Sequence, residues 1–196
     1  MSQPELGTTV ASRWAGRADE DAALLRRVAQ ADARAFEALY RVYFPRLHRF
    51  LERMTHRLQL VDEILDDTML VVWQKAYTFN GRSLVSTWIF AIAYRKALNA
   101  LHGFDEAVGE VEDRVSDDPG PDASVQHSEL REVLVNAIDR ISPVHRAVIE
   151  LTYYQGCAYL EIATIMDCPV DTVKTRMFHA RRHLRRLIGD RQEDLL

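Results

Sequence analysis

The chain of 196 residues is 47% hydrophobic and 28% charged, with a formal net charge of −4. This composition is typical of a globular protein that buries one or two modest cores. No apolar run approaches the roughly 20 residues needed to cross a bilayer, and the N-terminus lacks the basic-then-apolar order of a signal peptide. We therefore expect a cytoplasmic protein without membrane insertion. The negative charge excludes a uniformly basic nucleic-acid binder, so DNA binding would require a local basic cluster.

Residues 1–19 show no regular spacing of apolar residues, and we expect them to form a mobile N-terminal extension. After them, apolar residues recur at the three- and four-residue intervals of a helix. Asp32 is a plausible N-cap for the second helix. Pro45 predicts a break or bend, after which a new helix face begins. Asn80 and Gly81 form a turn signal before a fourth helix. The apolar positions on these helices are Leu24, Leu25, Val28, Phe36, Leu39, Tyr40, Tyr43, Leu47, Phe50, Leu51, Met54, Ile64, Leu65, Met69, Val72, Trp73, Trp88, Ile89, Ile92, Ala93 and Leu101.

The predicted N-terminal helical domain, residues 20–103, is followed by an acidic stretch, residues 104–127. That stretch contains eight Asp or Glu residues, one Arg, two prolines and two glycines. We expect a flexible linker, because such a composition cannot bury enough apolar surface to fold. Helical spacing returns over residues 128–190. The sequence therefore predicts an all-α protein with two small helical domains joined by an acidic flexible linker.

The second domain has the signals of a helix-turn-helix. Ser142-Pro143 predicts a helix start, and Gly156 fits the end of that helix. A short helix over residues 159–166, a break at Asp167-Cys168-Pro169 and a long basic helix over residues 170–188 follow. A short helix, a turn and a basic helix are the parts of a DNA-binding helix-turn-helix.

The basic helix contains the side chains that DNA recognition requires. Lys174, Thr175, Phe178 and His179 share one face, and a basic cluster over residues 181–186 continues toward the C-terminus. The first group can reach base edges in the major groove while the second contacts phosphates. A basic cluster alone is commonly a solvated helix face, but the preceding helix and turn favour DNA binding here.

Two features of the first domain suggest other partners. The first is a group of acidic residues near Trp73, which consists of Asp62, Glu63, Asp66 and Asp67. These carboxylates would repel DNA and could bind a basic protein surface, although they could also form a solvated helix face. The second is a glycine turn surrounded by amide, hydroxyl, guanidinium and aromatic groups, which can together hold an unstacked base. Its members are Phe79, Asn80, Arg82, Ser83, Ser86, Thr87 and Trp88. Aromatic residues at such positions are, however, more often part of the core.

These motifs resemble a known family. The stretch VDEILDDTMLVVWQKA at 61–76, followed by Phe79, Gly81, Thr87-Trp88-Ile89 and Ile92-Ala93, is similar to the polymerase-binding and promoter-melting region of extracytoplasmic function (ECF) sigma factors of the sigma-70 family. The stretch EIATIMDCPVDTVKTR at 161–176 resembles the second DNA-binding region of that family. With Asp32, Ala35-Phe36 and Leu39-Tyr40, the resemblance covers most of residues 21–188.

The resemblance implies a transcription initiation factor that is not an enzyme and needs no cofactor or metal. It implies binding to the beta-prime clamp helices of core RNA polymerase through the first domain and to the beta flap through the second. The implied core-polymerase-binding residues are Asp62, Glu63, Asp66, Asp67, Val71 and Trp73. The acidic linker would thread toward the polymerase active site and RNA exit path. Proteins of this group are commonly held inactive by an anti-sigma factor, and within the holoenzyme the protein would be associated with the nucleoid.

Promoter recognition is divided between the two domains in similar proteins. A flipped base of the minus-ten element would be held by Phe79, Asn80, Arg82, Ser86, Thr87, Trp88, Tyr94, Arg95, Lys96 and Asn99. The minus-thirty-five element would be bound as duplex by Thr172, Lys174, Thr175, Arg176, Phe178, His179, Arg181 and Arg182.

Some positions depart from the family pattern. Asp66 replaces a common glutamine, Met69 a usual phenylalanine and Arg95 a common asparagine. Lys174 and His179 stand where arginine is frequent. Because lysine is a point donor whereas arginine forks onto guanine, base preference cannot be transferred from the family to this chain.

Two other classes of protein share part of this pattern. An operator-binding regulator with the same helix-turn-helix would leave the acidic helix and the glycine turn without a role. An enzyme with a metal held by His179 and His183 lacks a third ligand, and the neighbouring arginines would repel a cation. Cys157 and Cys168 lack metal or redox spacing, so we expect buried, reduced thiols.

Overall fold

The computed structural model describes residues 17–108 and 141–193, with side chains described through Gly103 and Arg186 in the two segments. Within these ranges every regular element is helical. Much of the predicted acidic linker, residues 104–127, lies outside the described ranges, as does almost all of the N-terminal extension. Residues 104–108 continue the fourth long helix rather than starting the linker. No helix in the described ranges is long and apolar enough to span a membrane.

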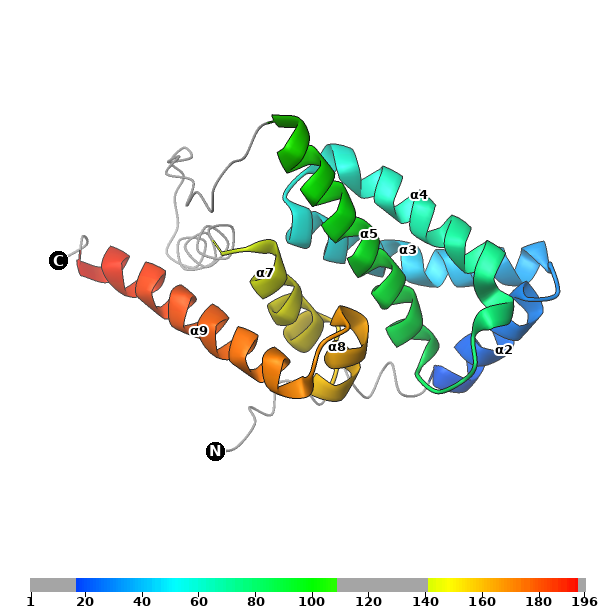
Figure 1. Ribbon diagram of the computed structural model, residues 1–196. Coiled ribbons are helices and arrows are strands. Elements are labelled where there is room, and N and C mark those ends of the chain that lie inside the picture. Colours follow the sequence, from blue (N-terminus) through cyan, green and yellow to red (C-terminus); the bar gives the residue numbers. More distant parts are fainter. Residues whose placement is uncertain (1–16, 109–140, 194–196) are drawn as a thin grey trace, which may run out of the picture.

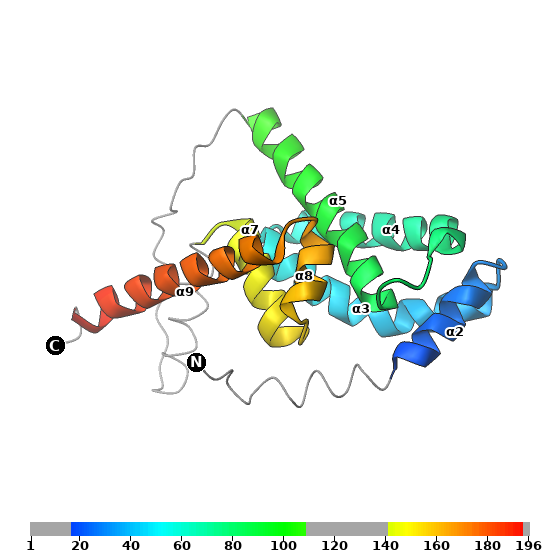
Figure 2. The ribbon, with the colours of Figure 1, turned by 60° about the horizontal axis from the view of Figure 1, so that its bottom comes forward.

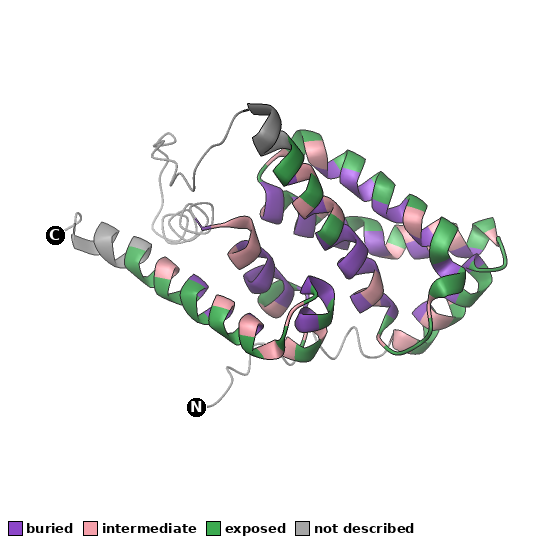
Figure 3. Cartoon of the chain, viewed as in Figure 1, coloured by how far each residue is buried: buried purple, intermediate pink, exposed green. Residues whose placement is uncertain are grey.

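The N-terminal domain consists of four helices, α2 (Ala18–Val28), α3 (Ala33–Thr55), α4 (Leu58–Lys75) and α5 (Val85–Val108), with a short 3-10 turn, η2 (Ala76–Thr78), after α4. Figure 1 shows α4 and α5 lying across α3, and α2 at the end of the bundle distant from the C-terminal domain. Each helix turns its buried stripe toward a common core, as Figure 3 shows.

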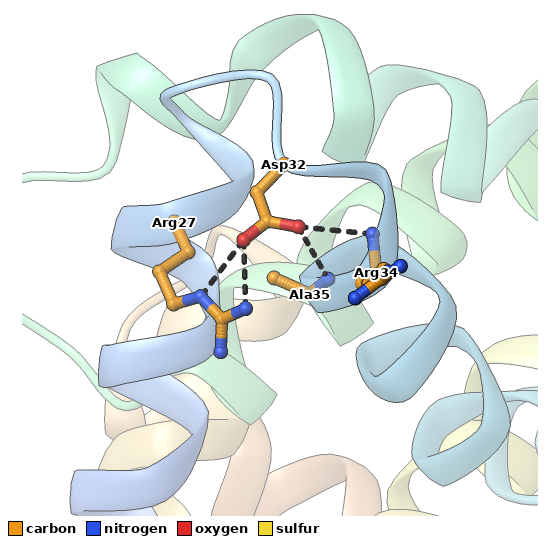
Figure 4. A network of polar contacts seen from close by, with 4 residues as sticks. All are labelled: Arg27, Asp32, Arg34 and Ala35. Carbon is orange, nitrogen blue, oxygen red and sulfur yellow. Dashed lines mark hydrogen bonds and ion pairs between the residues drawn. The ribbon is translucent and has the colours of Figure 1, made fainter.

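Asp32 caps the start of α3, as the sequence predicted. One of its carboxylate oxygens accepts hydrogen bonds from the backbone N–H groups of Arg34 at 3.0 Å and Ala35 at 3.1 Å. Its other oxygen accepts from Arg27 at 2.7 Å, which joins α2 to the cap (Figure 4). The Ala35 backbone hydrogen bond and then the Arg27 bond hold the pKa of the Asp32 carboxyl below its usual value.

The predicted break at Pro45 is absent from α3. Helix α3 runs without interruption through Pro45 to Thr55. Proline removes one backbone donor, but Tyr43 and Leu47 on either side are fully buried in the core. Their packing holds the helical turn around Pro45 in place. Helix α3 ends at Thr55, and the next residue, His56, has a left-handed backbone with φ of 53°.

Two buried contacts join the helices of the N-terminal domain. Phe50 of α3 packs edge-on against Phe90 of α5, with ring centroids 5.3 Å apart. The hydroxyl of Tyr43 donates to Asp21 Oδ2 of α2 at 2.6 Å. Burial is the main reason that the pKa of Tyr43 lies far above its usual value, so this hydroxyl remains a donor.

The C-terminal domain consists of α7 (Pro143–Ile149), a π-helical turn η3 (Glu150–Tyr154), α8 (Tyr159–Met166) and α9 (Val170–Glu193). Gly156, with φ of 67°, follows η3 where a helix stop was predicted. Glu161 accepts a hydrogen bond from the Ala158 N–H at 2.7 Å and so caps the start of α8. Asp167 takes a left-handed conformation, which forms the predicted turn between α8 and α9.

The two domains pack against each other. Helix α8 lies on α5, and α7 with η3 lies on α3, an arrangement visible in both Figure 1 and Figure 2. Helix α9 forms the outer edge of the C-terminal domain and extends away from the rest of the molecule.

Candidate protein and nucleic-acid interfaces

The acidic group on α4 is exposed. Asp62, Glu63, Asp66 and Asp67 all face solvent, while Val71 and Trp73 are half-buried. Asp66 accepts a long hydrogen bond of 3.4 Å from the hydroxyl of Tyr40, and Asp67 accepts one of 2.7 Å from Lys96 Nζ. We refer to these four carboxylates as the acidic face. Within the part of the chain that the structure describes, Asp67 is the member of the acidic face with a short ion pair, and the charge on the other three suits a basic protein partner.

An aromatic row on α3 borders the acidic face. Phe36, Tyr40, Phe44 and His48 follow one another at steps of four, and neighbouring ring centroids lie 5.6–6.2 Å apart. Trp73 packs edge-on against Phe36 at 5.2 Å. The aromatic row was missed as a surface feature, because the spacing of its members is also that of a buried helix stripe. Phe44 is 38% exposed, and His48 Nε2 lies 3.9 Å from Asp62.

The glycine turn between α4 and α5 has a defined shape. Asn80 Oδ1 accepts from the Arg82 N–H at 3.0 Å, and Gly81 has a φ of 72°. Asn80 and Arg82 are exposed and Ser86 is half-buried, whereas Thr87 is 2% exposed. The rings of Phe79 and Trp88 lie 5.7 Å apart, and both are half-buried. The turn thus presents amide, guanidinium and aromatic groups together.

Four predicted minus-ten residues lie on the middle of α5, in different surroundings. Arg95 and Asn99 are exposed one turn apart, and Lys96 is paired with Asp67. Tyr94 is only 3% exposed, and burial raises its pKa, while the nearby charge of Arg176 opposes the rise. In this arrangement Tyr94 is therefore not accessible to DNA.

Helix α9 presents most of the predicted minus-thirty-five residues to solvent. Those that are exposed are Lys174, Thr175, Phe178, His179, Arg181 and Arg182. Lys174 Nζ donates to Asp171 at 2.9 Å, and Arg181 donates to the Tyr153 hydroxyl at 2.6 Å. Thr172 and Arg176 are half-buried, and an Arg176 nitrogen lies 3.5 Å from Cys168 Sγ. The helix therefore has an exposed recognition face with one aromatic and several cationic groups.

Among the residues that the structure describes, there is no group of three or more His, Cys, Asp or Glu side chains placed to hold a metal ion. Both cysteines are free. Burial raises the pKa of the Cys157 thiol to about 12, which keeps it protonated and unreactive at neutral pH.

Family comparisons identify both domains. Residues 39–103 match the sigma-70 region 2 model, which includes the acidic face and the glycine turn. Residues 131–184 match the sigma-70 region 4 model, which includes the helix-turn-helix. The chain is an ECF sigma factor of the sigma-70 family. Sigma factors are transcription initiation factors and not enzymes, and the helix-turn-helix of α8 and α9 is the DNA-binding motif of the family.

Relatives match this ECF sigma factor over most of its length. The ECF RNA polymerase sigma factor SigK of Mycolicibacterium vanbaalenii is 31% identical over 85% of this chain and 88% of its own. The ECF RNA polymerase sigma-E factor of Haemophilus influenzae is 30% identical over 82% and 91%. The RNA polymerase sigma-H factor of Pseudomonas aeruginosa is 26% identical over 83% and 91%.

Solved structures share its fold. The sigma factor RpoE of Bartonella quintana, in complex with the anti-sigma factor NepR, aligns with a TM-score of 0.61 at 22% identity over 79% of this chain and 96% of its own. CnrH, in complex with the cytosolic domain of CnrY, aligns with a TM-score of 0.65 at 22% identity over 87% and 97%.

Proposed function

We propose that this sigma factor binds the beta-prime clamp helices of core RNA polymerase through the acidic face and the adjoining aromatic row. The observation that supports this most is that one chain presents an exposed acidic helix in one domain and an exposed basic recognition helix in the other. A basic, amphipathic helical surface of polymerase would find both opposite charge and an apolar contact there. The C-terminal domain would contact the beta flap.

The minus-ten element is bound by the glycine turn and α5. The exposed Asn80 and Arg82 side chains, with Phe79 and Trp88 behind them, can hydrogen-bond and stack with a base that has left the duplex. Arg95 and Asn99 then contact the backbone of the melted strand. Holding that base stabilises the open promoter, which is how the protein assists melting.

The minus-thirty-five element is bound as duplex by α9. Lys174, Thr175 and Phe178 at the N-terminal end of the helix contact base edges, and Arg181 and Arg182 contact phosphates. In the cell the protein acts at the nucleoid as part of the holoenzyme. An anti-sigma factor controls it; the support for this is that a solved structure with the same fold, the sigma factor RpoE of Bartonella quintana, is a complex with the anti-sigma factor NepR. The regulated genes belong to a stress or envelope response.

The test is in vitro transcription with purified core polymerase on a promoter library. The intact protein should give promoter-specific transcripts, and Asp62→Arg with Asp66→Arg should abolish them together with core binding. Glu37→Arg on α3 is the matched control, since it reverses an exposed charge outside the acidic face. If the intact protein folds and binds duplex DNA but gives no promoter-specific transcripts with core polymerase, the proposal is wrong.

A further inference from the structure

The π-helical turn η3 exposes two consecutive tyrosines that face different arginines. Tyr153 is 44% exposed and Tyr154 is 45% exposed. The ring of Tyr154 lies under Arg53 of α3, 3.9 Å from the guanidinium carbon. The hydroxyl of Tyr153 instead accepts a hydrogen bond of 2.6 Å from Arg181 on α9, whose guanidinium carbon also lies 5.7 Å from the centroid of the Tyr153 ring. Tyr153 therefore joins η3 to the exposed side of the recognition helix.

Arg181 lies on the same face of α9 as two proposed base-reading residues. The residues of this face are spaced by four, three and four positions, so they lie along one side of the helix. They are Lys174, Phe178, Arg181 and Arg185, and all four are exposed. The first two stand near the N-terminal end of α9, where base edges are read, and the arginines farther along the same face can reach phosphates. Tyr153 thus lies beside the part of α9 that is proposed to contact the DNA backbone.

The hydrogen bond between the two side chains prepares a second donor for the same ligand. A guanidinium group has only donors, whereas a phenol has one O–H donor and can also accept. The Tyr153 oxygen accepts from Arg181, so the phenol hydrogen is not used in that bond and can be donated to a further acceptor. The positive charge of Arg181 polarises the phenol O–H group and strengthens it as a donor. Two adjacent donors with one positive charge suit an oxygen anion such as a phosphodiester.

We propose that Tyr153 and Arg181 form a phosphate-binding pair, in which the phenol hydroxyl and the guanidinium donate to the same phosphodiester beside the minus-thirty-five element. Tyr153 in this pair both binds the phosphate and positions Arg181. The contact lies on η3, outside the helix-turn-helix of α8 and α9. The inference rests on the proposed function, because it requires α9 to lie on promoter duplex. Since a phosphate carries no sequence information, the pair should strengthen binding without changing base preference.

The first experiment measures how the full-length protein binds a duplex with the minus-thirty-five element of a promoter that it transcribes in vitro. Tyr153→Phe keeps the ring and removes the hydroxyl, so affinity should fall about threefold to tenfold, as expected for one lost hydrogen bond. The loss should be equal on an unrelated duplex. Tyr154→Phe is the matched control, because this neighbouring tyrosine is equally exposed but faces Arg53 instead of α9. It should bind as the wild type does.

A second experiment locates the phosphate. Single phosphates of the duplex are replaced in turn by neutral methylphosphonates, and fluorescence anisotropy gives the affinity for each. The wild type should lose affinity when one phosphate beside the element is replaced. Tyr153→Phe and Arg181→Ala should each lose much less at that position, because part of the contact is already missing. Arg182→Ala, which changes a neighbouring proposed phosphate contact, should remain fully sensitive there.

These outcomes separate phosphate binding from a purely structural role of Tyr153. Thermal unfolding followed by circular dichroism should be nearly unchanged in Tyr153→Phe. If this variant is unstable, Arg181→Ala tests the same phosphate from α9. Wild-type DNA affinity in Tyr153→Phe, or equal sensitivity to every methylphosphonate in Arg181→Ala and the wild type, would overturn the pair and leave the proposed function standing. If the intact protein transcribes no promoter specifically, the proposed function fails and the pair fails with it.

Discussion

Lys96 Nζ donates to Asp67 Oδ2 at 2.7 Å, so a predicted minus-ten residue on α5 is paired with a predicted polymerase-binding residue on α4. The pair neutralises part of the charge of Asp67 before any partner arrives. We therefore expect Asp67→Asn to weaken core polymerase binding less than Asp66→Asn, because the Asp66 carboxylate accepts a long, neutral hydrogen bond of 3.4 Å from Tyr40. Competition binding at low and high salt measures the difference.

The Lys96→Met background provides the control for this comparison. Without Lys96, no ammonium group offsets the charge of Asp67, and Asp67→Asn should then cost as much affinity as Asp66→Asn. Equal losses in both backgrounds would show that the Lys96 pair has no influence on polymerase binding. Because both partners are partly exposed, the pair should contribute roughly 0.5 kcal/mol or less to folding, so stability should not confuse the measurement.

Phe50 and Phe178 should separate stability from DNA binding. Phe50 is fully buried against Phe90, so Phe50→Ala should lower the free energy of unfolding by about 3–5 kcal/mol in urea denaturation. Phe178 is 62% exposed on α9, so Phe178→Ala should leave unfolding nearly unchanged and weaken binding to minus-thirty-five DNA. A strongly destabilised Phe178→Ala protein would contradict the exposed recognition face.

Asp171 should restrain Lys174. The Asp171 carboxylate accepts from Lys174 at 2.9 Å, and this bond is the main cause of its lowered pKa. A base edge must compete with Asp171 for the ammonium group, so Asp171→Ala should raise duplex affinity. Lys174→Ala should instead weaken binding to minus-thirty-five DNA more than binding to unrelated duplex, whereas Arg182→Ala, at a proposed phosphate contact, should reduce the slope of log affinity against log salt by about 1. Fluorescence anisotropy on both duplexes over a salt series tests this, and an equal loss on both duplexes in Lys174→Ala would place Lys174 away from the base edges.

Local chemistry made much of the fold predictable. The Asp32 cap, the glycine stop at Gly156 and the turn at Asp167 each depend on residues within a few positions, so the sequence alone indicated them. The continuity of α3 through Pro45 was not predicted. The free-energy cost of a proline inside a helix is offset there by tertiary packing, which cannot be inferred from the neighbouring sequence.

The exposure of candidate site residues could be predicted where it depends on their spacing along one helix. It could not be predicted where residues far apart in the sequence come into contact. Lys174 and Phe178 are exposed as their spacing on α9 indicated. The burial of Tyr94 and the Lys96–Asp67 pair depend on how different helices pack, and the paired residues are 29 positions apart. The spacing of apolar residues along one helix does not specify that packing.

Glu150 should make closure of the two domains depend on pH. Its pKa is raised above 4.5, chiefly by burial, while the charges of Arg53 and Arg49 and the bonds from Arg53 and Gln155 oppose the rise. Because the packed arrangement of the two domains holds the proton more tightly than a separated one, Glu150 favours packing fully below the usual carboxyl pKa. That contribution is lost as pH rises through the raised pKa. The radius of gyration should therefore increase as pH rises from about 4.5 toward neutrality. Glu150→Gln, which resembles the protonated side chain and keeps an acceptor for Arg53, should remain compact and lose this dependence. If Glu150→Gln shows the same pH profile as the wild type, another group controls closure and the assignment to Glu150 is wrong.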